Sequence, residues 1–174
     1  GRLIKDKGIV EYLEAAKIIN KKYPNTSFTV LGSIDLSNLS HINSDYINEH
    51  KKFKFLNFIS FVENTYEIID KHDCLILPSY REGIPRVIME AQSMGIPVLA
   101  TNVPGCNSLI KANINGFLFK ERDVKSLVNV IEKFINSDIN TLNKISNNAY
   151  VNISTNFEEK IILDRYMEVI NNLW

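Results

Sequence analysis

The chain alternates between short apolar runs, typical of buried strands, and longer stretches that carry apolar residues at helical spacing. The pattern is clearest around residues 78–97. An apolar run at 73–77 predicts a buried parallel strand, and Pro85 suits the first turn of a following helix. One face of this helix carries apolar side chains for packing on a sheet: Val87, Ile88, Ala91 and Met94. Gly95 predicts its end, and residues 97–100 predict the next strand.

The same patterns predict elements on both sides of this unit. Expected strands lie at 27–31, 53–59 and 117–119, and expected helices at 9–22, 45–52, 64–71, 141–154 and 157–172. Another helix is expected after Asp123, a good capping residue, with an apolar stripe at Val124, Leu127, Val128, Ile131 and Ile135. No strand precedes Gly1, although residues 1–8 resemble a loop that leaves one. This alternation predicts an α/β fold, a Rossmann-like doubly wound parallel sheet with helices on both faces.

Composition narrows the function classes. The 174 residues fit one domain, and 45% of them are apolar, which is enough for a core. Twenty basic and twenty acidic side chains cancel, so we expect no nucleic-acid partner. Two cysteines and the lack of a signal peptide or a long apolar run favour a reducing, cytoplasmic location. No Asp-x-Asp pair occurs and the three histidines are scattered, so no metal site is expected.

Two glutamates flank the point where the central strand gives way to its helix. In strand–loop–helix units, ligands bind at the carboxyl end of the strand, against the start of the helix. Glu82 lies in that loop, and Glu90 lies on the helix. Simpler interpretations are also open: Glu82 could be an acid favoured by the helix dipole, and Glu90 could form a surface ion pair with Arg86.

The residues around these glutamates carry a family resemblance. They read P-S-x-x-E-G-x-P-x-x-x-x-E-A-x-x-x-G-x-P. This stretch resembles the Glu-x7-Glu motif of retaining glycosyltransferases of the GT-B fold, family 4, especially bacterial enzymes of lipid-linked oligosaccharide, capsule and lipopolysaccharide synthesis. The resemblance implies that Glu82 contacts the hydroxyls of the donor sugar, beside the loop residues Gly83, Ile84 and Pro85. It implies that Glu90 holds the ribose hydroxyls, a role suited to an ionised carboxylate, which only accepts hydrogen bonds.

The opening segment GRLIKDKG resembles the G-R-x-x-x-x-K-G motif of the same family. There the cations corresponding to Arg2 and Lys7 grip the diphosphate of the sugar nucleotide. The chemistry is reasonable, because negative charge grows on the phosphate as the sugar departs, and fixed cations stabilise it. Judged by spacing alone, both residues could instead be surface cations on a loop.

Two weaker resemblances complete the expected site. Residues 58–62 resemble the segment whose backbone meets the nucleotide base, which gives Phe61 and Val62 that role; Phe61 could also belong to the core. Residues 103–107 resemble a Gly-rich turn in which the backbone of Gly105 and Cys106 contacts the ligand, although the turn could be an ordinary connection. The family has an acid three residues after this Gly, where this chain has Ser108.

The resemblance implies that residues 1–174 are the C-terminal, nucleotide-sugar-binding half of a two-domain enzyme whose N-terminal acceptor domain is absent from this chain. The expected reaction is retaining transfer of a hexose or N-acetylhexosamine from a UDP-sugar to a lipid-linked or glycan acceptor, without a metal cofactor. The other domain could attach the enzyme to the inner face of the membrane. The isolated domain is expected to be inactive. A sugar-nucleotide epimerase of the same fold and a non-catalytic binding domain remain as alternatives.

Overall fold

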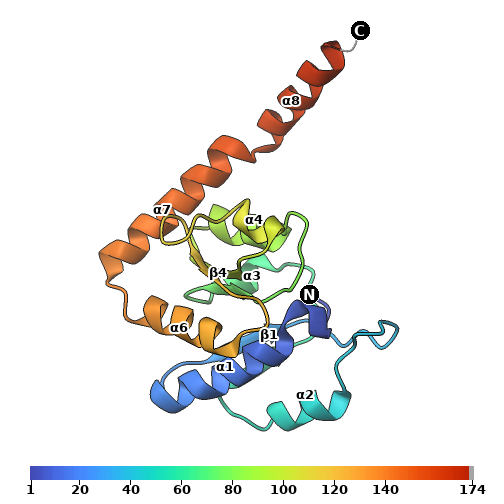
Figure 1. Cartoon of the computed structure of the whole chain (residues 1–174), viewed down its shortest axis with the longest axis vertical. Coiled ribbons are helices and arrows are strands. Elements are labelled where there is room, and N and C mark those ends of the chain that lie inside the picture. The colour runs from blue at the N-terminus through green and yellow to red at the C-terminus, as the bar shows by residue number, and fades with distance from the viewer. Residues whose placement is uncertain (173–174) are drawn as a thin grey trace.

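A computed structural model describes residues 1–172 as an α/β fold with a long helical arm (Figure 1). The strands are β1 (Phe28–Leu31), β2 (Leu56–Ile59), β3 (Leu75–Leu77), β4 (Val98–Thr101) and β5 (Phe117–Phe119). The first helical elements are η1 (Lys5–Lys7), α1 (Ile9–Lys22), α2 (Ser44–His50), α3 (Tyr66–Ile69) and α4 (Arg86–Ser93). They are followed by α5 (Pro104–Asn107), α6 (Val124–Ile135), α7 (Ile139–Asn156) and α8 (Glu159–Asn171).

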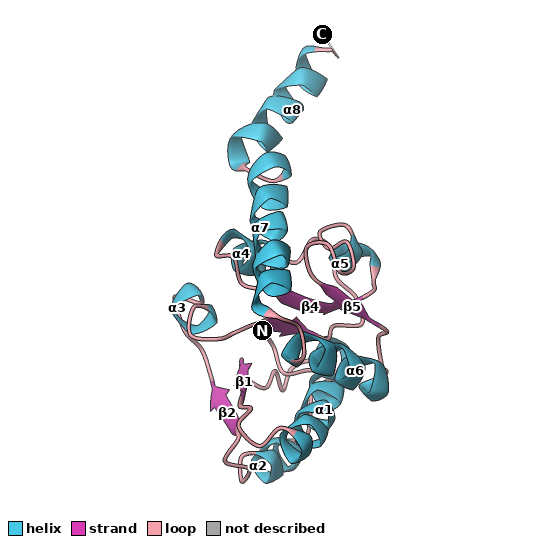
Figure 2. Cartoon of the chain, turned by 90° about the vertical axis from the view of Figure 1, so that its left-hand side faces the viewer, coloured by secondary structure: helices cyan, strands magenta, loops and turns pink. Residues whose placement is uncertain are grey.

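All strand pairs are parallel, as expected, but the strands form two sheets where one was predicted. In the first sheet β1 pairs with β2, with Phe28 opposite Leu56. In the second, β4 lies between β3 and β5, with Leu99 opposite both Ile76 and Phe117. The division lies between β1 and β3, because no strand among residues 1–172 pairs with the facing edge of either (Figure 2).

Helices cover both faces of the sheets, which confirms the predicted fold class. Strand β4 is buried along its whole length, and its side chains alternate between two hydrophobic cores. Leu99 points into the core formed with α1 and α6, while Val98 and Ala100 point into the core that includes residues of α4 and α7. Figure 1 shows this layering, with β4 between α4 on one side and α1 and α6 on the other.

Most expected helices and strands are present within a few residues of their predicted bounds. Helix α6 begins as its cap predicted, because Asp123 accepts a hydrogen bond from Ser126 N at 2.9 Å. The predicted strand at 53–59 was too long, since Phe53 N bonds to His50 O in a turn and pairing begins at Leu56. The expected helix at 64–71 is the single turn α3, and the turn after β4 contains the short helix α5.

The last two helices form an arm that leaves the body of the domain. Helix α7 is anchored by Ile145 and Ala149, which are buried, and it packs against α4. None of the residues of α8 is buried, and the helix projects beyond the other elements (Figure 1). Helix α7 thus belongs in part to the body of the domain, while α8 does not.

Because β4 is buried on both of its faces, a substitution in this strand tests the fold. We expect Leu99→Ala to lower the free energy of unfolding by about 2–5 kcal/mol, because it removes a fully buried side chain and leaves a cavity. Urea denaturation measures the change. Leu39→Ala is the matched control, since Leu39 is fully exposed and its loss should change stability by less than about 0.5 kcal/mol. Equal losses for both variants would contradict the assignment of β4 to the core.

Candidate functional site

A cavity of about 510 Å³ opens beside the carboxyl ends of β1 and β3. It brings together five of the residues singled out from the sequence, although they lie up to 88 positions apart: Arg2, Lys7, Glu82, Pro85 and Glu90. The carboxyl edge of a parallel sheet is where α/β folds place ligands, because the loops that follow the strands converge there.

A close ion pair in the cavity joins Lys7 and Glu82. Lys7 Nζ lies 2.7 Å from Glu82 Oε1, and the Glu82 side chain is only 13% exposed. Backbone contacts hold the two loops together: Tyr80 N donates to Asp6 O at 2.8 Å. Gly8, at φ 67°, lies so close to the Pro78 carbonyl that a side chain would overlap it. The pair is therefore positioned by the backbone as well as by its own charges.

Gly105, at the start of α5, packs against the other side of the same loop. A methyl group at this position would overlap the carbonyl oxygens of Glu82 and Gly83. Its neighbour Cys106 is buried, and burial raises the pKa of the thiol to about 11, so it remains neutral at pH 7. Ser108, at the position where the family has an acid, donates to Gly105 O at 2.8 Å. This short helix thus supports the loop that carries Glu82.

Glu90 is half-buried on α4, and its side chain contacts Thr65, the residue that directly precedes α3. Thr65 Oγ1 lies 3.4 Å from Glu90 Oε2, at the long limit of a hydrogen bond. Thr65 also lines the cavity. Nothing in the sequence around Thr65 predicted that it would belong to the site. The alternative ion pair is not seen: within residues 1–172 no salt bridge joins Glu90 to Arg86.

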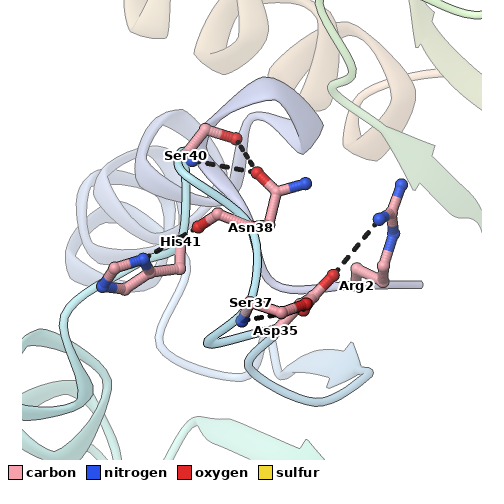
Figure 3. A network of polar contacts seen from close by, with 6 residues as sticks. All are labelled: Arg2, Asp35, Ser37, Asn38, Ser40 and His41. Atoms are coloured by element: carbon pink, nitrogen blue, oxygen red, sulfur yellow. Dashed lines mark hydrogen bonds and ion pairs between the residues drawn. The ribbon is translucent and has the colours of Figure 1, made fainter.

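Arg2 lies at the exposed rim of the cavity and is held by a residue that the sequence analysis missed. Arg2 Nη1 contacts Asp35 Oδ2 at 3.2 Å (Figure 3). Hydrogen bonds from Ser37 and the charge of Arg2 hold the pKa of Asp35 below its usual value. The same loop repeats the motif, with Asn38 accepting from Ser40. Asp-x-Ser and Asn-x-Ser are patterns typical of side-chain-stabilised turns, and they are the sequence signal by which an ordered loop could have been predicted here.

The remaining predicted site residues do not line the cavity. Phe61 is 80% exposed, so its alternative assignment to the core was wrong, and Val62 is half-buried. Ile84 is 59% exposed. Gly83 is exposed beside Glu82, and Gly105 and Cys106 lie buried behind the loop. The structure therefore groups the four charged residues but leaves these backbone contacts as predictions.

The grouped residues can bind a ligand that combines an anion with hydroxyl groups. Arg2 and Lys7 supply hydrogen-bond donors with positive charge, and Glu82 and Glu90 supply acceptors. Within the part of the chain that the structure describes, no group of three or more His, Cys, Asp or Glu side chains is arranged to hold a metal ion. In that same part, no helix has the length and apolar character needed to cross a membrane.

Comparison with known proteins decides the family. Residues 1–152 match the family described as glycosyl transferases group 1. The chain belongs to this family. Its fold and its bacterial polysaccharide-synthesis relatives agree with the GT-B assignment made from the sequence.

Two bacterial glycosyltransferases resemble the chain over nearly its whole length. It is 31% identical to the capsular polysaccharide biosynthesis glycosyltransferase CapM of Staphylococcus aureus, covering 98% of this chain and 44% of CapM. It is 32% identical to UDP-Gal:alpha-D-GlcNAc-diphosphoundecaprenol alpha-1,3-galactosyltransferase of Escherichia coli, covering 99% of this chain and 45% of the relative. The chain therefore spans less than half the length of either relative.

A solved structure of a group 1 glycosyl transferase domain has the same fold. The C-terminal domain of LpcC from Francisella tularensis superposes with a TM-score of 0.78 at 27% identity. The match covers 91% of this chain and 84% of that domain.

The close packing around Glu82 gives a second test. We expect Gly105→Ala to destabilise the protein by about 1–3 kcal/mol, because the added methyl group forces the Glu82 loop to move. Gly83→Ala is the matched control on the other side of the contact, where a methyl group meets no atom within 4 Å. Thermal and urea unfolding of both variants measure the difference. A tolerated Gly105→Ala would show that the loop is not fixed by α5.

Proposed function

We propose that this chain is the donor-binding part of a retaining, family 4 glycosyltransferase. It would take a hexose or N-acetylhexosamine from a UDP-sugar for transfer to a lipid-linked or glycan acceptor. The observation that carries the proposal is the Lys7–Glu82 pair, which shares one cavity with Arg2 and Glu90. The named donor and acceptor of the E. coli relative, UDP-Gal and a diphosphoundecaprenol-linked sugar, support this substrate class.

The two cations would hold the diphosphate. Lys7 carries three N–H donors, so it can keep its bond to Glu82 and still donate to a phosphate oxygen. Arg2 is 61% exposed and uses one nitrogen on Asp35, so other donors of its guanidinium remain available. As the sugar leaves, negative charge grows on the phosphate. Both cations would therefore stabilise the transition state more than the ground state.

The two carboxylates would bind the other two parts of the donor, the sugar and the ribose. Glu82 would accept hydrogen bonds from the sugar hydroxyls while Lys7 keeps it oriented. Glu90 would hold the ribose hydroxyls, with Thr65 beside it. By resemblance, backbone at Gly83, Ile84 and Pro85 would meet the sugar, that of Gly105 and Cys106 the diphosphate region, and that of Phe61 and Val62 the base.

The acceptor would bind to a second domain, which the longer relatives have room for. Holding donor and acceptor together is worth up to about 7–11 kcal/mol in favourable cases. We therefore propose that this part alone binds the donor but transfers no sugar at a useful rate. In the whole enzyme the other domain would bring the site to lipid-linked acceptors at the cytoplasmic face of the membrane.

Calorimetric titration with UDP tests the diphosphate assignment. We expect UDP to bind without added metal, and Arg2→Ala and Lys7→Met each to weaken binding by about 1.5–3 kcal/mol, because each removes a charge-assisted hydrogen bond. Lys5→Ala is the control, since Lys5 is an exposed cation on the same short helix η1 and does not line the cavity. Loss of binding in EDTA with both variants unaffected would contradict the proposal, and no binding at all would favour a non-catalytic domain.

The roles of the two glutamates can be separated. Glu90→Gln should weaken UDP and UDP-sugar alike, because the ribose is common to both. Glu82→Gln should leave UDP affinity nearly unchanged and lower the turnover of the two-domain enzyme, since the sugar contacts tighten in the transition state. Ser93→Ala is the control on the same helix; Ser93 is exposed and does not line the cavity, so its loss should leave UDP affinity unchanged. Equal UDP affinities for wild type and Glu90→Gln would remove Glu90 from the site.

A further inference from the structure

Arg86 is a third cation at the cavity, besides Arg2 and Lys7. It is the first residue of α4, and its side chain is exposed. One interpretation of the sequence paired it with Glu90, but within residues 1–172 no salt bridge joins the two. A cation that precedes its acid on a helix is the less favourable order for such a pair. The charge of Arg86 is therefore left for another partner.

The other two cations already have carboxylate partners. Lys7 Nζ lies 2.7 Å from Glu82 Oε1. Arg2 Nη1 lies 3.2 Å from Asp35 Oδ2. In the part of the chain that the structure describes, no carboxylate lies within ion-pair distance of the Arg86 guanidinium. An anionic ligand can therefore form a charge-assisted hydrogen bond with Arg86 without displacing an existing partner.

The start of α4 is an unfavourable place for a cation when no ligand is bound. The first turn of a helix carries partial positive charge, which favours acidic residues there and disfavours basic ones. The first turn of α4 contains no acidic residue, and Pro85 before it supplies no side-chain hydrogen bond to the free N–H groups. An anion bound beside Arg86 would offset both positive charges. The position of Arg86 is thus better explained by an anionic ligand than by the stability of the helix.

The spacing of Arg86 from the two glutamates indicates which part of the ligand it meets. Arg86 lies four residues after Glu82 and four residues before Glu90. In the proposed function Glu82 binds the sugar and Glu90 the ribose, and the diphosphate joins these two parts of the donor. Side chains four residues apart on a helix have Cβ atoms about 5–6 Å apart, so Arg86 lies one turn from the ribose. Lys7, in contact with Glu82, lies at the sugar end instead.

We propose that Arg86 binds the phosphate that is bonded to the ribose, while Lys7 binds the phosphate that is bonded to the sugar. This inference rests on the proposed function, because it takes Glu90 as the ribose end of the site. The planar guanidinium of arginine can donate two parallel hydrogen bonds to phosphate oxygens. When the sugar leaves, negative charge grows chiefly on the other phosphate. Arg86 therefore contributes to binding of the nucleotide more than to turnover.

The test compares three ligands that differ only in their phosphates. Uridine has none, UMP has the ribose-linked phosphate alone, and UDP has both. NMR titration, which measures millimolar dissociation constants, is applied to wild type, Arg86→Ala, Arg86→Lys and Arg81→Ala. Arg81 is the matched control, because its loss removes the same charge from the loop before α4. Its side chain is 84% exposed, pairs with Asp6 and does not line the cavity.

We expect Arg86→Ala to weaken UMP and UDP by the same factor, at least about fivefold, because both carry the phosphate that it binds. Binding of uridine should not change. Arg86→Lys should recover part of the affinity, since lysine keeps the charge but lacks the planar fork. Arg81→Ala should bind all three ligands as wild type does. The melting temperatures of all variants should stay at the wild-type value, because both side chains are exposed.

Three results would overturn the inference. Weaker binding of UDP with UMP unaffected would place Arg86 on the other phosphate, and weaker binding of uridine would place it on the nucleoside. An equal loss in Arg81→Ala would show a general effect of net charge. If Lys7→Met and Glu90→Gln weaken UDP as proposed while Arg86→Ala does not, this inference alone fails. If the wild-type chain binds no UDP, the proposed function fails with it.

Discussion

The site depends on the close approach of three backbone segments that are distant in the sequence. Gly8 lies against the carbonyl of Pro78, and Gly105 lies against the carbonyls of Glu82 and Gly83. Neither approach leaves room for a side chain, so the loop that carries Glu82 is held from both sides by backbone. The 2.7 Å contact between Lys7 and Glu82 follows from this arrangement more than it causes it. A partly exposed ion pair alone is usually worth too little to position two loops.

The sequence predicted those parts of the fold in which local signals agree with tertiary packing. Asp123 capped α6 as expected, and the helix expected at 9–22 is α1, with Leu13 and Ile19 on its buried face. The predictions failed where tertiary context decides. The strand expected from Phe53 begins at Leu56, because the chain before it is used in turns that close α2. The division into two sheets depends on which strands lie side by side, and the periodicity of a sequence predicts strands but not their neighbours.

The candidate site was predictable in its charged residues and less so in their partners. Arg2, Lys7, Glu82 and Glu90 were identified because two motifs with fixed spacing carry them, and the structure places all four around one cavity. Asp35 and Thr65, which contact Arg2 and Glu90, lie outside these two motifs, Asp35 in a polar loop and Thr65 beside a single helical turn. Their positions depend on how loops from different strands fold over the sheet edge. No spacing rule within a single loop contains that information.

The placement of α1 and α4 on opposite faces of the sheet has a consequence for the cavity itself. The segment that carries Lys7 continues into α1 on one face, and the segment that carries Glu82 continues into α4 on the other. Two chain segments that leave neighbouring positions and turn in opposite directions must separate, and a crevice opens between them. The hollow is thus a product of winding direction, present before any side chain is chosen. Substitutions of the charged residues around the cavity can change which ligand it binds, while the cavity itself stays at the same edge of the sheet.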